Sequence, residues 1–178
     1  MSLRRLLVVL LALAAAGGGA GASGWLEGGG ENDGPDAGGG GRGDASVGRV
    51  VKVVDGDTIH VQVGAVREKV RYIGIDTPET KDPRRPMQCF GQKASQFNER
   101  LVGGERVRLV RDIEERDRFG RLLAYVYRAR DGLFVNAELA RLGYAKPLSI
   151  PPDVRFAERF ATLAREARDH DRGLWSAC

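Results

Sequence analysis

The stretch that most constrains the fold of this chain is residues 71–80, Arg-Tyr-Ile-Gly-Ile-Asp-Thr-Pro-Glu-Thr. Its apolar half predicts a strand, and Pro78 predicts where the strand pairing stops, because proline has no N–H to donate to a neighbouring strand. The turn that follows presents two carboxylates, Asp76 and Glu79, and Arg71 precedes them. Carboxylates bind hard cations, and guanidinium groups bind phosphate. This combination suggests phosphoryl chemistry at the end of a strand.

In a regular strand Arg71 and Asp76 have opposite parity, so their side chains would point to opposite faces of the sheet. Gly74 lies between them, and a glycine inside a strand pattern is a natural place for a bulge or a sharp twist. We therefore expect the backbone to leave regular strand geometry at Gly74 and to bring the arginine and the carboxylate together.

Short segments rich in β-branched residues lie on both sides of this stretch, and they predict a domain with five strands. The predicted strands are residues 47–54, 58–63, 66–75, 105–111 and 122–127. Apolar residues at helical spacing predict three helices, at residues 90–101, 135–142 and 156–167. Periodicity alone therefore indicates the α+β class and no particular topology.

Residues 1–22 have the organisation of an export signal. Arg4 and Arg5 form its charged start, an apolar run follows at 6–16, and small residues at 20–22 form a cleavage site. An apolar run of this length is too short to span a bilayer. We expect a secreted protein, or one of the periplasm or cell envelope, with no stable membrane association after signal cleavage. An uncleaved anchor is the alternative.

Residues 23–45 are dominated by glycine and acidic side chains, which bury too little apolar surface to offset the entropy of ordering. We therefore expect a disordered linker, followed by one folded domain at 46–178. Residues 1–44 hold three arginines and five acidic residues, so a total net charge of +4 becomes +6 for residues 45–178. A basic domain favours polyanionic partners, and a basic surface that serves only solubility is the alternative.

Cys89 and Cys178 are the only cysteines of the sequence. An even number of cysteines in an exported protein suggests a disulfide, which here would tie the first helix of the domain to the C-terminus. Free buried thiols are the alternative. Catalytic cysteine chemistry is not expected, because no histidine partner is evident.

Two further stretches complete the pattern: Asp-Gly-Asp-Thr at 55–58 supplies a carboxylate, and Asp-Arg-Phe-Gly-Arg at 117–121 supplies an arginine. In order and spacing, the chain closely resembles the staphylococcal (thermonuclease) nuclease family over roughly residues 46–176. The matching pieces are residues 54–58, 71–80 and 117–125, with Val135, Asn136, Leu139 and Gly143. The resemblance implies a five-stranded OB-fold, a Greek-key β-barrel often used on nucleic acids, with the three helices around it.

The resemblance implies that Asp57 and Asp76 are metal ligands, with the backbone carbonyl of Thr77 as a third. Such a site has only oxygen ligands and leaves several positions to water, which suits Ca2+ better than zinc or copper. The two histidines, His60 and His170, have no cysteine or histidine at metal-ligand spacing, so a zinc site is not expected. A turn aspartate with no metal is the alternative reading of Asp57.

Glu79 is the candidate general base, because a carboxylate on a rigid turn beside the metal site can orient or deprotonate an attacking water. Arg71 and Arg121 are the candidates that bind the phosphate oxygens and the charge that develops in the transition state. The alternative for Glu79, considered singly, is an exposed carboxylate in a turn. The alternative for each arginine is a salt bridge on the surface. Their occurrence together in the order of the family favours the catalytic roles.

Arg118 and Phe119 match positions at which the family holds a basic and an aromatic residue near the nucleotide. Phe119 offers a ring for stacking and no hydroxyl for a hydrogen bond to phosphate. Ser149 and Pro151 stand where the best-known member of the family carries two tyrosines that flank the base. The resemblance therefore does not extend to base stacking or to nucleotide preference.

Arg84 and Arg85 lie with Lys81 in a proline-broken loop beside the acidic turn. Basic side chains at this place are candidates for contacts with phosphates that flank the scissile one. An ordinary solvated loop is the alternative.

The leading functional hypothesis is an exported, Ca2+-dependent endonuclease that acts on DNA and RNA as a monomer, with a preference for single strands and little sequence specificity. The resemblance further implies in-line attack by water and cleavage of the 5′ P–O bond, which leaves 3′-phosphates. A non-catalytic OB-fold module that binds single-stranded nucleic acid is the alternative, and an envelope interaction domain on a glycine-rich arm is a third reading. The full set of acids and arginines favours catalysis.

Overall fold

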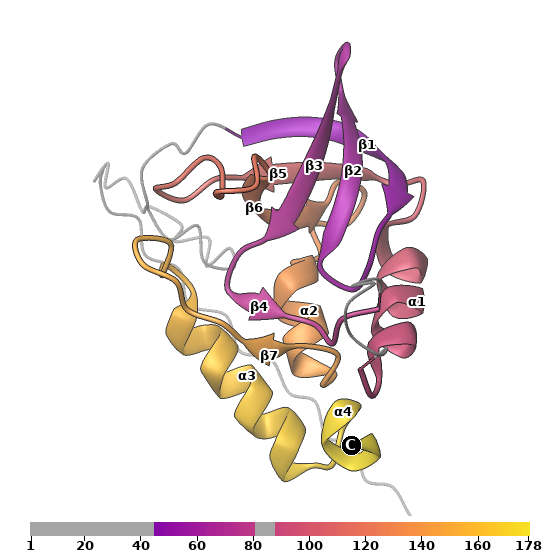
Figure 1. Cartoon of the computed structure of the whole chain (residues 1–178), viewed down its shortest axis with the longest axis vertical. Helices are drawn as coiled ribbons and strands as arrows, with labels where there is room; N and C mark the ends of the chain where they lie inside the picture. The colour runs from indigo at the N-terminus through magenta and orange to yellow at the C-terminus, as the bar shows by residue number, and fades with distance from the viewer. Residues whose placement is uncertain (1–44, 81–87) are drawn as a thin grey trace, which may run out of the picture. The chain divides into compact units, whose positions relative to one another are not determined.

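The computed structural model describes residues 45–80 and 88–178, and its centre is a closed five-stranded barrel (Figure 1). The barrel strands are β1 (Ala45–Val53), β2 (Thr58–Val63), β3 (Val66–Tyr72), β5 (Arg106–Val110) and β6 (Leu122–Arg128). They follow one another in the order β1-β2-β3-β6-β5, and β3 and β6 form the one parallel pair of this barrel. The five-stranded barrel and the α+β class confirm the predicted fold class.

A two-stranded sheet and four helices complete the described domain (Figure 1). The sheet pairs β4 (Ile75–Asp76) with β7 (Lys146–Pro147), and the helices are α1 (Gly91–Val102), α2 (Val135–Arg141), α3 (Ala157–Asp169) and α4 (Leu174–Ala177). The predicted count of three helices is corrected by α4. This helix has four residues, which is too short for apolar periodicity to reveal.

The predicted strand at 66–75 is wrong in its extent, because it ends at Tyr72 and resumes as β4. Gly74 breaks it: its φ is +82°, and a Cβ at this position would collide with the ring of Phe160 on α3. Only glycine adopts this conformation without strain and leaves room for the helix. The turn was expected from sequence, and it redirects the chain so that Asp76 lies on the same side as Arg71.

The side chain of Asn136 fixes this turn from inside the core. Its amide donates to the carbonyl of Ile73 over 2.9 Å, and its carbonyl accepts the N–H of Val126 on β6 over 2.9 Å. Asn136 is fully buried, so these two bonds satisfy backbone groups that no water reaches. The start of α2 thereby connects Ile73, the residue that follows β3, to strand β6.

A disulfide joins Cys89, just before α1, to Cys178 at the C-terminus, with Cα atoms 6.0 Å apart. The two residues are 89 apart in sequence, and closing so long a loop stabilises the folded state by about 4 kcal/mol in the chain-entropy model. The bond therefore ties the last helix, α4, to the first.

We expect native protein to contain no thiol that reacts with a labelling reagent, because both cysteines are consumed in this bond. Mass spectrometry of protein unfolded in the absence of reductant measures this directly. Two labelled thiols under those conditions would contradict the disulfide, and labelling only after reduction would support it.

Several sequence-based expectations fall on residues 1–44 and 81–87, which lie outside the described part of the chain. They are the export signal at 1–22, nearly all of the linker at 23–45, and the loop residues Arg84 and Arg85. Within residues 45–80 and 88–178, no helix has the length and apolar character that crossing a membrane requires.

Candidate active site

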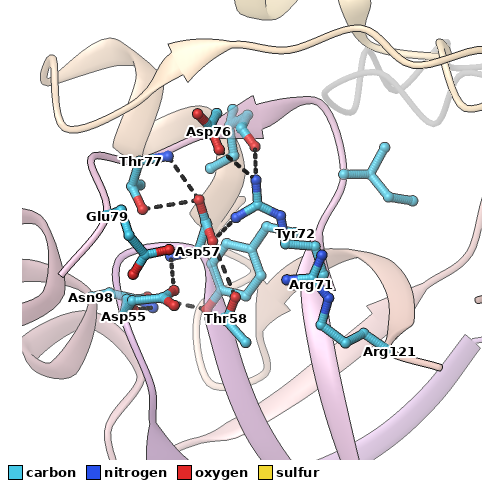
Figure 2. A network of polar contacts seen from close by, with 12 residues as sticks. Asp55, Asp57, Thr58, Arg71, Tyr72, Asp76, Thr77, Glu79, Asn98 and Arg121 are labelled. Carbon is cyan, nitrogen blue, oxygen red and sulfur yellow. Dashed lines mark hydrogen bonds and ion pairs between the residues drawn. The ribbon is translucent and has the colours of Figure 1, made fainter. Parts of the chain in front are cut away.

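Asp57 lies at the centre of a polar network where the turn after β1 meets the turn after β4 (Figure 2). Its Oδ2 accepts hydrogen bonds from the backbone N–H and the hydroxyl of Thr77, over 2.7 and 2.9 Å. Its Oδ1 accepts from the hydroxyl of Thr58 over 3.1 Å. Only glycine fits at position 56, because a Cβ there would lie 2.7 Å from the side chain of Thr77. The Asp-Gly-Asp motif therefore clamps the two turns together.

Arg71 lies between two carboxylates (Figure 2). One of its terminal nitrogens pairs with Oδ1 of Asp57, and the other donates to Oδ1 of Asp76 over 2.7 Å and to the carbonyl of Ile75 over 3.3 Å. The side chain of Asp57 is 2% exposed, whereas that of Asp76 is 56% exposed. The two acids, which are 19 positions apart in sequence, thus face one positive group at the edge of the barrel.

Glu79 is held on the far side of the same turn by contacts of its backbone and its carboxylate. Its N–H donates to the side-chain oxygen of Gln88 over 2.9 Å, and its carbonyl accepts the N–H of Gln88 over 3.0 Å. One carboxylate oxygen accepts the N–H of Thr80 over 2.8 Å. Gln88 just before α1 therefore positions a residue that sequence reasoning identified, although Gln88 itself was missed.

Arg121 is oriented by Asp117 within the turn before β6. The Nε of Arg121 donates to Oδ2 of Asp117 over 2.6 Å, while Oδ1 accepts the N–H groups of Phe119 and Arg121 over 2.9 and 3.0 Å. Burial disfavours the charged form of Asp117, but these hydrogen bonds outweigh it and lower its pKa. Asp117 is thus a charged anchor that leaves the two terminal nitrogens of Arg121 available to a ligand.

One cleft of about 220 Å3 brings these side chains together. The predicted residues that line it are Asp57, Arg71, Asp76, Thr77, Glu79 and Arg121. In the view of Figure 2, Glu79 and Arg121 lie on opposite sides of the pair formed by Arg71 and Asp57. Two guanidinium groups and a carboxylate across a small cleft form an arrangement that can hold a phosphate group between a base and two cations.

Comparison of the sequence with known proteins identifies the family of this chain. Residues 69–177 match the family model described as staphylococcal nuclease homologue. The thermonuclease of Staphylococcus hyicus is 38% identical over 128 residues, which cover 72% of this chain and 75% of that protein. The thermonuclease of Staphylococcus intermedius is 39% identical over 126 residues, which cover 71% of this chain and 74% of that protein. The chain belongs to the staphylococcal nuclease family.

A third relative, endonuclease YncB of Bacillus subtilis (strain 168), is 37% identical over 127 residues, which cover 70% of this chain and 59% of that protein. The predicted family is therefore confirmed by a family model and by relatives from two genera. The OB-fold that the resemblance implied is the barrel described above.

A second cavity of about 190 Å3 adjoins the cleft, and both share Arg71 and Arg121. Its apolar wall includes Leu148 and Ile150, whereas Ser149 and Pro151 do not line it. Leu148 and Ile150, which are neighbours of Ser149 and Pro151 in the sequence, thus line the cavity that Arg71 and Arg121 also line. Sequence reasoning missed these two residues. The segment after β7 contacts the β3–β4 turn, where the N–H of Leu148 donates to the carbonyl of Gly74 over 3.0 Å, and such contacts decide which of its side chains face inward.

Arg118 and Phe119 line neither of these two cavities. The ring of Phe119 is exposed, and the guanidinium groups of Arg118 and Arg121 lie over it at 4.8 and 5.5 Å from its centroid. Phe119 therefore lies on the rim, where it contacts Arg121 and remains open to solvent.

The donor set of the cleft fits a hard divalent cation. Within residues 45–80 and 88–178 no group of three or more His, Cys, Asp or Glu side chains converges on a metal-sized space. Asp57 and Asp76 nevertheless line the same cleft and contact the same guanidinium group, and the backbone N–H of Thr77 donates to Asp57. Two carboxylates on one cleft supply oxygen ligands of the kind that Ca2+ prefers, and water would fill the other positions.

Proposed function

We propose that this nuclease is a Ca2+-dependent endonuclease that hydrolyses the phosphodiester bonds of DNA and RNA with little sequence preference. The observation that carries the proposal is the position of Arg71 between Asp57 and Asp76, in one cleft with Glu79 and Arg121. A binding module needs the cations of such a cleft and has no use for a carboxylate held opposite them.

In this proposal Arg71 and Arg121 bind the non-bridging oxygens of the scissile phosphate. A guanidinium group donates parallel hydrogen bonds and stays charged at all relevant pH values, so it stabilises the negative charge that grows in the transition state. Asp117 acts as a positioning residue, because it holds Nε of Arg121 and directs the remaining nitrogens away from itself.

Glu79 activates the attacking water. It accepts a proton from this water while the water oxygen forms a bond to phosphorus and the bond between phosphorus and the 5′-oxygen breaks. The leaving 5′-oxygen takes a proton from solvent, so the products are a 3′-phosphate and a 5′-hydroxyl. When it is bound by Asp57, Asp76 and Thr77, Ca2+ would supply positive charge that neutralises the phosphate oxygens.

The location, substrate form and oligomeric state belong to the same proposal. The signal-like residues 1–22 support export to the cell surface, the periplasm or the medium, followed by release from the membrane. Clefts of about 190 and 220 Å3 suit one flexible strand better than a paired duplex, which supports a preference for single strands. The lining residues of the cleft named above all come from one chain, which supports a monomer.

Analysis of product ends tests the proposed chemistry. A single-stranded oligonucleotide digested with Ca2+ should give fragments with 3′-phosphates, because the 5′ P–O bond is the one that breaks. Treatment with a 3′-phosphatase followed by mass spectrometry identifies them. Fragments that carry 5′-phosphates and 3′-hydroxyls would contradict the assigned bond, and intact substrate would contradict the endonuclease.

A further inference from the structure

A band of positive side chains crosses the outer face of three barrel strands and ends at the cleft. On β3, Arg67, Lys69 and Arg71 alternate along the strand and therefore share one face. The intervening Val70 is fully buried in the core, so this shared face points outward. Arg71 is the member of the row that enters the cleft, and the other two lead away from it along the strand.

The neighbouring strands widen this row. Lys69 is paired across the sheet with His60 on β2, which in turn is paired with Lys52 on β1. Arg67 is likewise paired with Gln62, which is paired with Arg49. In Figure 1 the three strands lie side by side.

A bulge in β1 allows both of its cations to face outward. Arg49 and Lys52 have opposite parity and would point to opposite faces of a regular strand. The register shifts between Val50 and Lys52, so one extra residue is accommodated there. Arg49 and Lys52 are consequently both exposed, while Val50 between them lies in the core.

Three cations of this band, unlike Arg71, lack the acidic partners that several other arginines of the domain have. Salt bridges elsewhere in the described residues include Arg111–Glu115, Arg116–Glu68, Arg121–Asp117, Arg128–Asp131, Arg130–Glu105, Arg141–Glu138 and Arg155–Asp112. Across the part of the chain that the structure describes, Lys52, Arg67 and Lys69 have no salt bridge. These three cations are paired across the sheet with His60 or Gln62 and not with an acid, which leaves their charge available to a polyanionic ligand.

The electrostatic field of the band is evident at His60, which lies between Lys52 and Lys69. Burial lowers the pKa of His60, and the surrounding cations lower it further. The lowered pKa favours the neutral imidazole, so the positive charge of the band comes mainly from its lysines and arginines.

We propose that Lys52, Arg67 and Lys69, together with Arg49, form a phosphate-binding track that holds the same nucleic-acid strand on one side of the scissile bond. This inference rests on the proposed nuclease function. Alternate residues of a strand are about 6.6 Å apart, which is close to the separation of successive phosphates along an extended single strand. The four side chains of the track are aliphatic amines and guanidinium groups with no aromatic ring for base stacking, so we expect the track to contact mainly the phosphate backbone.

The test compares a long single-stranded oligonucleotide with an aryl ester of one nucleotide, which fills only the cleft. The variant Lys52→Gln/Arg67→Gln/Lys69→Gln should raise KM for the long strand roughly tenfold at low salt. The slope of log KM against log salt should fall by about 2, since each single-strand phosphate contact contributes about 0.7. The values of kcat and KM for the mononucleotide ester should not change, because the cleft is intact.

A matched control removes the same charge from elsewhere. The variant Lys93→Gln/Arg100→Gln/Arg165→Gln neutralises three exposed cations on α1 and α3 and should leave the salt slope unchanged. Equal effects of both triple variants would show that net charge alone matters and would overturn the track. The single variants Lys52→Gln and Lys69→Gln should each lower the slope by about 0.7, which guards against a folding defect in the triple variant.

Failure of the track and failure of the proposed nuclease function give different results in this experiment. An unchanged slope in the track variant, with full hydrolysis of the mononucleotide ester, would overturn the track and leave the nuclease standing. Failure of the wild-type protein to hydrolyse either substrate would overturn the nuclease. If the track variant lost binding to vesicles of anionic phospholipid and kept its KM for the long strand, the band would be a membrane-binding surface, and the track would be refuted.

Discussion

Replacing Glu79 by glutamine is expected to lower kcat by about two to four orders of magnitude, which is the usual contribution of general-base catalysis. The amide has nearly the same shape as the carboxylate, and it can still accept the N–H of Thr80. It cannot take a proton from water. Because Glu79 need not touch the phosphate, KM for a short single-stranded substrate should change little.

A matched control for this variant is Glu166→Gln, which makes the same chemical change on an exposed part of α3. Its kcat should equal that of the wild-type protein. Steady-state kinetics of both variants at saturating Ca2+ separate the two expectations. If Glu79→Gln kept near-normal kcat, Glu79 would not be the base, and another group would have to accept the proton.

Replacing Asn136 by alanine should produce the largest loss of stability among single changes near the site. The substitution leaves the carbonyl of Ile73 and the N–H of Val126 buried without partners. An unsatisfied buried group costs about 1–3 kcal/mol, so the free energy of unfolding should fall by about 2–6 kcal/mol. That is a large share of the roughly 5–15 kcal/mol that a domain of ordinary stability has.

Chemical denaturation followed by circular dichroism measures this change at unaltered disulfide content. The variant Gln96→Ala on α1 removes an exposed amide and should shift the free energy of unfolding by no more than about 0.5 kcal/mol. A loss below about 1 kcal/mol for Asn136→Ala would mean that water or a relaxed backbone satisfies the two groups. In that case the account of how α2 holds the Gly74 turn would be incorrect.

Sequence patterns predicted the barrel strands well where one face is apolar and the turns are short. The predicted strand at 58–63 has the bounds of β2, and the strand predicted at 122–127 is one residue shorter than β6. The break at Gly74 was expected from sequence, but the strand predicted at 66–75 was too long, because sequence does not show that β3 ends at Tyr72 and that Ile75–Asp76 pairs in a separate sheet. The close approach of Phe160, which requires that glycine, is a tertiary contact with a distant helix.

The candidate site could be predicted in pieces but not in its geometry. Spacing and resemblance identified the acids and arginines, and the structure brings them into one cleft. Asp117 belongs to the motif at 117–121, but its role was not predicted, because that role depends on the turn that points its carboxylate at Nε of Arg121. Leu148 and Ile150 were missed, because their side chains enter the second cavity only when the segment after β7 pairs with the Gly74 turn.

The most direct test of the central claim is the digestion of denatured DNA, first with Ca2+ and then with an excess of chelator. We predict rapid degradation with Ca2+, loss of activity in chelator, and recovery when Ca2+ is restored, because in the proposed site Asp57 and Asp76 would bind the ion that offsets the phosphate charge. Asp76→Asn should raise the Ca2+ concentration needed for half-maximal activity and lower the maximal rate. Full activity in chelator would rule out the assigned metal ligands, and binding without degradation under all conditions would show a nucleic-acid-binding module instead of a nuclease.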